Sequence, residues 1–209
     1  YPPHFFEVSF SLERGQKLAV MGKNGIGKST LLKTMNGNLE PVSGIFKWGD
    51  GVEIGYFDQH VAEYTSGQTI LSDFWGAFPD LPQNEIRSFL GTFLFRGDDV
   101  YKKVSSLSGG ERARLSFAKI FMKRPNVLLL DEPTNHMDLL GKETLEDILK
   151  QYKGTIVFVT HDRYFVNKIA DSILFFDEGG VKYLKGGIAA DRCPAVYSRL
   201  EEYEKSIRT

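Results

Sequence analysis

The chain contains almost no cysteine, since Cys193 is the only one among its 209 residues. A single cysteine excludes both a disulfide framework within the chain and a zinc site built on cysteine pairs. No apolar run approaches the roughly 20 residues that cross a membrane as a helix, and no signal peptide is visible. These absences favour a cytoplasmic protein in a reducing compartment, with no membrane domain in this chain.

An excess of one charge sign is also missing, because 26 Lys and Arg residues face 27 Asp and Glu residues, for a formal net charge of −1. The whole chain therefore lacks the basic footprint of a nucleic-acid binder, and RNA contact would need a local patch or a part outside this sequence. Apolar residues make up 42%, enough for a core in one domain or one divided domain. Because the chain begins at Tyr1 without a methionine, we expect it to be a piece of a longer protein.

Glycine, in contrast, is concentrated where it indicates a ligand. Directly after the apolar run Leu18–Met21, the sequence follows the pattern G-x-x-x-x-G-K-[ST] with the residues Gly22, Lys23, Asn24, Gly25, Ile26, Gly27, Lys28, Ser29 and Thr30. Placed between a strand and a helix, this pattern predicts a loop whose backbone N–H groups hold phosphate oxygens at the positive end of the helix. A glycine turn without a ligand is the alternative, but the strand and helix context disfavours it.

The residue types in this phosphate loop predict how a nucleoside triphosphate would be held. Lys28 can reach the β- and γ-phosphates, and the Ser29 hydroxyl can bind Mg²⁺. A second segment supports the same chemistry, because the apolar run Val127–Leu130 ends in Asp131 and Glu132. A strand buried on both faces of a parallel sheet has this pattern, and ligands bind at the carboxyl ends of such strands. Asp131 suits the metal, and Glu132 is placed to accept a proton from an attacking water.

A third segment contains another candidate anion site. Leu107 precedes two glycines and a serine at the start of a predicted helix, in the order Ser108, Gly109, Gly110 and Glu111. Unpaired N–H groups, a hydroxyl and a helix dipole together attract an anion. The simpler interpretation is that Ser108 is only an N-cap beside a glycine turn. If both cradles bind phosphate, the natural use of this one is to contact nucleotide held by another subunit.

These motifs together resemble the nucleotide-binding domain of ATP-binding-cassette (ABC) proteins, and they occur in the family's order. The resemblance covers about Tyr1–Tyr183 and includes a glutamine loop at Gln59, the signature segment Leu107–Glu111, a D-loop at Asp138 and a switch histidine at His161. It implies that Gln59 bridges Mg²⁺ and the attacking water, that His161 senses the γ-phosphate, and that Asp138 shapes the contact between two cassettes. His161 as an ordinary loop histidine is the alternative.

Within the family, the stretch Asn135–Asp138 and the run Thr160–Phe165 resemble the F subfamily. Members lack membrane domains, carry two cassettes in one chain, and mostly act on ribosomes as translation or antibiotic-resistance factors. The resemblance therefore implies a second cassette and the ribosome or its RNA as partners. The 48 positions from Gln59 to Leu107 leave little room for the helical arm of many first cassettes, which indicates a second cassette.

Other functions share parts of this pattern. The energy-coupling subunit of a membrane transporter would have the same catalytic residues, but usually a different tripeptide at Asn135–Met137. A regulatory switch that binds ATP with little turnover is disfavoured by Glu132. SMC- and Rad50-like ATPases require a long coiled coil, which this sequence lacks. Tyr1 stands where cassettes stack an aromatic ring on adenine, although it could be a frayed terminus. Phe5 is the next candidate.

The expected fold is α/β: a P-loop NTPase core with a mostly parallel sheet, an antiparallel β subdomain and an inserted helical subdomain at about residues 67–122. We expect a cassette domain over residues 1–185 and an irregular segment and helix over 186–209. The alternation of Phe6–Leu12 predicts a half-buried strand, and Gly44–Trp48 and Val52–Phe57 are predicted as paired strands around Gly49, Asp50 and Gly51. The aromatic side chains of Phe89, Phe93 and Phe95 are expected in the core rather than as a base-stacking surface.

Overall fold

The structure is a computed structural model that describes residues 7–177 and 180–185. The chain divides into two compact units. The first consists of Tyr1–Ile54, Asn126–Asp131 and Lys153–Thr209, and the second of Gly55–Pro125 and Glu132–Tyr152. The boundary between Asp131 and Glu132 assigns the two neighbouring candidate carboxylates to different units.

A six-stranded sheet in the order β2-β3-β4-β1-β5-β6 is the main element of the fold. Its strands are β1 (Lys17–Gly22), β2 (Ile54–Phe57), β3 (Val127–Asp131), β4 (Thr155–Val159), β5 (Ser172–Asp177) and β6 (Gly180–Lys185). The pairs β3–β4, β4–β1 and β1–β5 are parallel, and β5–β6 is antiparallel. This confirms the predicted α/β class with a mostly parallel sheet.

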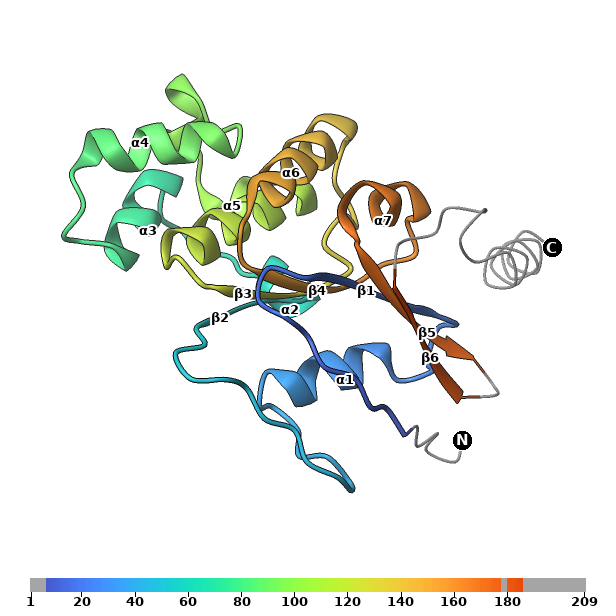
Figure 1. Cartoon of the computed structure of the whole chain (residues 1–209). Coiled ribbons are helices and arrows are strands. Elements are labelled where there is room, and N and C mark those ends of the chain that lie inside the picture. Colours follow the sequence, from blue (N-terminus) through green and yellow to red (C-terminus); the bar gives the residue numbers. More distant parts are fainter. Residues whose placement is uncertain (1–6, 178–179, 186–209) are drawn as a thin grey trace. The chain divides into compact units, whose positions relative to one another are not determined.

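Helices cover both faces of this sheet within the first unit. Helix α1 (Lys28–Met35) packs on one face and α7 (Arg163–Ile169) lies on the other (Figure 1). Residues of the central strand β1 from Leu18 to Val20 are fully buried, as are Leu128–Leu130 of β3. Continuous apolar runs therefore form these strands, because both of their faces are removed from water.

The second unit is mainly helical, and side chains cap several of its helix starts. It contains α2 (Gln59–Ala62), α3 (Ile70–Ala77), α4 (Gln83–Thr92), α5 (Gly109–Met122), α6 (Leu139–Gln151) and the 3₁₀ turns η1 (Gly97–Tyr101) and η2 (Val104–Ser106). Thr69 caps α3, Ser108 caps α5 and Asp138 caps α6, each by accepting a hydrogen bond from a backbone N–H. The helical spacing at Ile70–Trp75 is confirmed as α3, and that at Asn84–Phe95 is confirmed as α4 up to Thr92, after which Phe93–Phe95 leave the helix.

The stripe of Phe89, Phe93 and Phe95 packs inside the second unit, as predicted, with Phe89 half-buried. Phe93 and Phe95 are buried. The ring of Phe89 lies 5.5 Å from that of Phe93 and 6.2 Å from that of Phe74 between centroids. Such spacings are typical of packed aromatic clusters rather than of exposed stacking surfaces.

The local prediction of antiparallel strands was partly wrong. Residues 7–12 and 44–48 form no strand, and of the predicted strand at Val52–Phe57 only Ile54–Phe57 is formed. A strand of this kind needs neighbours that bury one of its faces, whereas Ile45 is 98% exposed. In the described residues the antiparallel strand pair is instead β5–β6, and β6 was not predicted. The expected helix at Ser198–Ile207 and the irregular segment before it lie outside the described residues.

Candidate functional site

The phosphate loop begins where β1 can approach β5 only because residue 22 is a glycine. Gly22 has a φ of 147°, and a Cβ atom there would lie 2.5 Å from the carbonyl oxygen of Phe176. Gly25 and Gly27 follow with φ values of 75° and 109°, in the left-handed region that glycine adopts at little cost. These three glycines therefore shape the turn from β1 into α1.

Lys28 is the buried cation of this loop, with only 5% of its surface exposed. Its ammonium group donates to the carbonyl oxygen of Gly22 at 2.8 Å and to that of Lys23 at 2.7 Å. The side chain thus folds back across the loop. A cation held in this position is close to any phosphate that the loop amides would bind.

The start of α1 is arranged differently from most helix starts. Its N-cap, Gly27, is left-handed and no side chain caps the helix. Of the remaining predicted loop residues, Ile26 is buried, and four are exposed: Lys23, Asn24, Ser29 and Thr30. A helix start without a side-chain cap presents its first N–H groups and its positive dipole end to an anion.

The strand register places Asp131 and His161 at the same edge of the sheet as this loop. Asp131 is paired with Val159 of β4, and Val159 is paired on its other side with Val20 of β1. His161 follows Val159 by two residues. Since the three strands are parallel, their carboxyl ends bring Asp131, His161 and the phosphate loop to one edge.

His161 is held in place by its neighbours and is electrostatically linked to Lys28. Asp162 caps α7 by accepting from the N–H of Phe165 at 3.1 Å, and its own N–H donates to the Thr160 hydroxyl at 3.1 Å. Burial, and secondly the positive charge of Lys28, lower the pKa of His161 below its usual 6.5. Neutral imidazole is therefore the favoured form at neutral pH.

Glu132 begins the second unit with a φ of 49°, an uncommon value for a residue other than glycine. Gln59 is the first residue of α2, a four-residue helix, and the structure describes no more of its side chain. Their predicted roles, as base and metal partner, stay predictions. Tyr1 and Phe5 lie outside the described residues, so adenine stacking is also untested.

The signature segment forms a closed capping box at the start of α5. The N–H of Glu111 donates to the Ser108 hydroxyl at 3.2 Å, and the N–H of Ser108 donates to the Glu111 carboxylate at 2.8 Å. Gly109 is half-buried and Gly110 is buried. Ser108 is therefore an N-cap, as the simpler interpretation held, but its exposed hydroxyl still has a proton to donate. Glu111 turns back to the helix start and does not project outward.

Asp138 is an N-cap too, since it accepts from the N–H of Gly141 at 2.9 Å at the start of α6. Its position at a contact between cassettes stays a prediction. Sequence reasoning did not identify His136 as a contact of the signature segment. A Cβ atom on Gly110 would lie 2.7 Å from the His136 carbonyl oxygen. A backbone contact of this kind leaves no signal in a single sequence.

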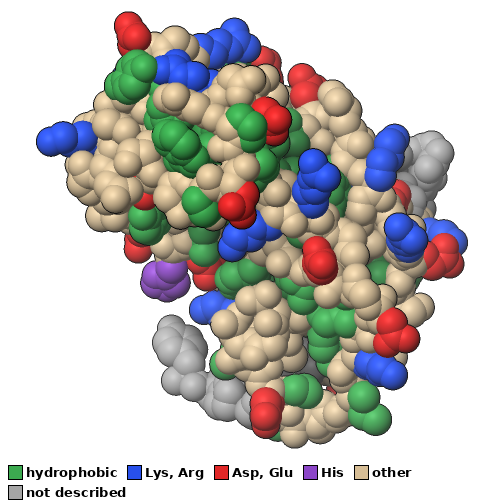
Figure 2. Space-filling view, turned by 90° about the vertical axis from the view of Figure 1, so that its left-hand side faces the viewer, with side chains coloured by type: hydrophobic (Ala, Val, Ile, Leu, Met, Phe, Trp, Pro, Cys, Tyr) green, Lys and Arg blue, Asp and Glu red, His purple; other side chains and the backbone are tan. Residues whose placement is uncertain are grey.

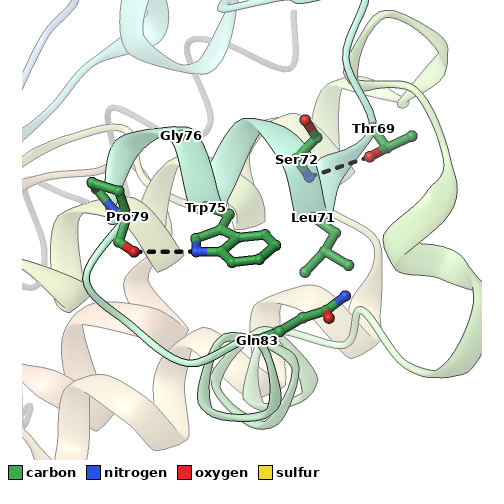
Figure 3. Close-up of a pocket in the computed structure, with 7 residues that line it drawn as sticks. All are labelled: Thr69, Leu71, Ser72, Trp75, Gly76, Pro79 and Gln83. Carbon is green, nitrogen blue, oxygen red and sulfur yellow. Dashed lines mark hydrogen bonds between the residues drawn. The ribbon is translucent and has the colours of Figure 1, made fainter.

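A hollow of about 630 Å³ lies in the second unit at α3 and the start of α4, away from the predicted motifs in sequence (Figure 3). Its lining residues are Thr69, Leu71, Ser72, Trp75, Gly76, Pro79 and Gln83. The Trp75 indole donates to the carbonyl oxygen of Pro79 at 3.3 Å and is 42% exposed. None of the predicted site residues lines this hollow.

In the described part of the chain, none of the helices is long and apolar enough to cross a membrane. Residues 7–177 and 180–185 contain no group of three or more His, Cys, Asp or Glu side chains arranged to hold a metal ion. On the face shown in Figure 2, acidic and basic side chains are interspersed, with hydrophobic side chains among them.

Comparison with known proteins identifies relatives over most of the chain. Residues 5–135 match the ABC transporter family. YdiF of Bacillus subtilis is 55% identical over 173 residues, which cover 83% of this chain and 27% of YdiF. ABC transporter F family member 5 of Arabidopsis thaliana is 42% identical over 177 residues, which cover 84% of this chain and 26% of that protein. The chain thus spans about a quarter of the length of these two relatives.

A solved structure supports the same assignment for the fold. A metal-chelate type ABC transporter in an inward-facing conformation aligns with a TM-score of 0.70 and 26% identity, covering 86% of this chain and 75% of that chain. The family match includes the phosphate loop, the signature segment and the Asp131–Glu132 strand end. The chain therefore belongs to the ABC family as an ATP-binding domain, with members of the F family among its relatives.

Proposed function

We propose that this domain binds ATP with Mg²⁺ and hydrolyses it to ADP and phosphate. The observation that carries the proposal is the phosphate loop. Three positive-φ glycines precede a helix start without a side-chain cap, and the buried Lys28 ammonium lies across the loop. Loop amides and Lys28 would bind the β- and γ-phosphates, which a helix N-terminus and a cation both favour.

The residues present fit a magnesium ion better than a metal held by protein ligands alone. Mg²⁺ keeps several waters and is bound through one or two carboxylates together with substrate phosphates. Asp131 would supply the carboxylate, and the Ser29 hydroxyl and the Gln59 amide would supply neutral oxygens. The absence of a larger ligand cluster among the described residues agrees with this arrangement. The metal would neutralise charge that develops on the phosphates during transfer.

Glu132 would act as the general base toward the attacking water. Glu132 directly follows Asp131. Asp131 would be occupied with Mg²⁺, so the carboxylate of Glu132 would be the one that accepts the proton of the attacking water. His161, whose pKa is lowered, would donate a hydrogen bond from its imidazole N–H to a γ-phosphate oxygen without adding a second positive charge beside Lys28. Tyr1 would stack on the adenine ring.

The working unit is proposed to be a pair of cassettes, either two in one longer protein or two copies of this chain. Ser108, Gly109 and Gly110 would close over nucleotide bound to the opposite cassette, while Glu111 holds the helix start and Asp138 contributes to the contact. The cassette would comprise residues 1–185, with a helical subdomain at about 67–122 and a terminal segment at 186–209. Loss of the γ-phosphate would then open the pair.

We further infer that the whole protein is cytoplasmic and acts on the ribosome, because F family members are among the relatives. The mixed charge on the face in Figure 2 indicates that RNA contact would come from a local region or from parts beyond this chain. Fractionation of the native protein tests this step. It should sediment with ribosomes in the presence of ATP, and recovery with membranes would favour a transporter subunit instead.

Phosphate release from MgATP by the purified chain tests the enzymatic proposal. Release should depend on Mg²⁺ and stop with EDTA. A matched sample carrying Lys28→Ala is the control for contaminating ATPases, because it changes one loop side chain. ATP binding without any phosphate release by a parent chain that sediments as a dimer with MgATP would contradict hydrolysis and favour a binding switch.

A further inference from the structure

The loop from Glu132 to Asp138 contains two residues in an uncommon backbone conformation. Glu132 and His136 have φ values of 49° and 63°, both in the left-handed region. That region is costly for residues with a side chain, although His, Asn and Asp enter it more readily than others. Two such residues within five positions define a sharply folded segment.

Hydrogen bonds and burial hold this loop as one stiff body. The N–H of Asn135 donates to the carbonyl oxygen of Glu132 at 3.2 Å, and that of Met137 donates to Thr134 at 3.3 Å. Pro133 is buried and has a fixed φ. Thr134 and Met137 are buried as well. A shift at Glu132 would therefore be passed on to His136, since each turn of the loop is closed by its own bond.

The far end of the loop supports the start of helix α5. A Cβ atom on Gly110 would lie 2.7 Å from the carbonyl oxygen of His136 and 3.2 Å from the Cα of Met137. A Cβ atom on Gly109 would lie 3.6 Å from the Cβ of His136. Backbone thus rests on backbone, with no flexible side chain to absorb a displacement. The left-handed turn at His136 decides where its carbonyl oxygen lies.

We propose that His136 is a positioning residue that links the Glu132 end of this loop to the signature segment through its backbone conformation. The inference rests on the proposed function, because it joins the candidate base of one nucleotide site to the segment that closes the opposite site. His136 does not touch nucleotide in this scheme. Its role is to keep the start of α5 in register with Glu132, which follows the last residue of β3.

Amide hydrogen exchange on the isolated chain tests this link without a partner cassette. MgATP should slow exchange in the phosphate loop and also change exchange at the N–H of Arg112, which bonds to the Ser108 carbonyl oxygen at 2.9 Å. In His136→Val the branched side chain resists a positive φ, so Arg112 should exchange at least about tenfold faster and lose its response to MgATP. Protection of the phosphate loop should persist.

His136→Asn is the matched control, because it also removes the imidazole but tolerates the left-handed conformation. It should retain both responses. If His136→Asn shows the same fast exchange at Arg112 as His136→Val, the imidazole ring and not the backbone conformation is responsible, and the proposal is overturned. If Val keeps both responses, the proposal is overturned too. Should Val fail to fold in a melting experiment, His136→Ala decides: exchange at Arg112 must be faster than in the Asn variant, and equal rates refute the link.

The wild-type result separates this inference from the proposed function. Protection of the phosphate loop by MgATP without any response at Arg112 would refute the link and leave ATP binding intact. No protection at either place would refute ATP binding and the inference with it.

Discussion

Helices α1 and α5 both begin with glycine and a hydroxyl residue, yet their first turns are built in opposite ways. At α1 the N-cap is the left-handed Gly27, no side chain caps the helix, and the buried cation Lys28 follows at once. At α5 the N-cap is Ser108 in an extended conformation, and it forms a reciprocal capping box with Glu111. One helix start is open and positive, whereas the other is closed by its own side chains and carries a carboxylate.

This difference indicates a division of work between the two helix starts. An open start with a neighbouring ammonium can capture an anion from water, because its donors and its charge are available. The α5 start already uses its N–H groups at Ser108 and Glu111, and the Glu111 carboxylate, which lies 3.7 Å from the Lys102 ammonium group, offers no donor to an incoming anion. The start of α5 is therefore better suited to contact a nucleotide that is already bound to the opposite cassette than to capture one from water. The glycine pattern alone does not distinguish these cases, since both segments are rich in glycine.

The largest expected effect comes from removing the cation of the open start. Lys28→Ala should weaken MgATP binding by about 100-fold or more, since charge-assisted bonds to phosphate are worth roughly 1.5–3 kcal/mol each. The fold should persist, because the two bonds of the ammonium group to the carbonyl oxygens of Gly22 and Lys23 lie within the loop itself. Isothermal titration with ATP measures the affinity. An unchanged affinity would show that α1 is not the capturing site.

Removing the candidate base should act on turnover and leave capture alone. Glu132→Gln keeps the shape of the side chain but cannot take a proton, so phosphate release should fall by roughly 10²-fold with ATP affinity preserved. Stopped-time phosphate assays and titration with ATP measure the two quantities. Near-normal turnover in this variant would mean that a different group activates the water.

A bulky residue at the start of α5 should weaken dimerisation of the chain without weakening the binding of ATP to a single chain. In a chain that carries Glu132→Gln, MgATP should promote a dimer, and adding Ser108→Arg should weaken that dimer at least about tenfold by placing a bulky side chain at the cradle. Sedimentation with ATP and with ADP measures the effect. The comparison variant is Ser108→Ala, which removes the hydroxyl and with it the cap, worth about 1 kcal/mol of helix stability, but adds no bulk, so it should weaken the dimer less than Ser108→Arg.

The proposed division between capture at α1 and pairing at α5 requires that dimerisation depends on the γ-phosphate. Equal dimerisation with ATP, with ADP and in the Ser108→Arg variant would contradict a composite site at α5. A monomer under all conditions would instead indicate that pairing needs the other cassette of a longer protein.

The smallest effect concerns the charge beside the open start. The folded pKa of His161 is lowered by burial first and by Lys28 second. Between that lowered value and about 6.5, the unfolded chain binds more protons than the folded chain, so folding stability is present above this window and is lost as the pH falls through it. In Lys28→Met the pKa should rise only part of the way toward its usual value. An NMR titration of His161 in both chains measures this, and an unchanged pKa would exclude coupling to Lys28.

Much of the fold could be predicted from the pattern of apolar and polar residues along short segments. The apolar runs ending at Met21, Leu130 and Thr160 predict buried parallel strands, and all three are central strands of the sheet. The local pattern was insufficient at Gly44–Trp48. Its apolar residues before the glycine turn predict a strand, but the segment buries too little of its surface to form one. A strand depends on a partner that the segment itself does not specify.

The position of the candidate site could also be predicted in part from the sequence. The types of Lys28, Asp131 and His161, together with strand ends in a parallel sheet, predict one edge of the sheet as their common place, and the register agrees. The sequence did not predict the orientation of the Glu111 side chain. A glutamate at this position can point outward or can bond to the backbone of Ser108, and the sequence does not distinguish the two.

The sequence by itself determined the phosphate loop, the ends of the buried strands and the family, because these depend on residue types at short spacing along one backbone. Only the tertiary structure decided that Gly22 must approach Phe176, that Gly110 must rest on the carbonyl of His136, and that α5 is closed where α1 is open. Each of those outcomes is a contact between segments distant in sequence, or a choice between local hydrogen bonds of similar energy. Their geometry is settled by packing, and packing is a property of the whole folded chain.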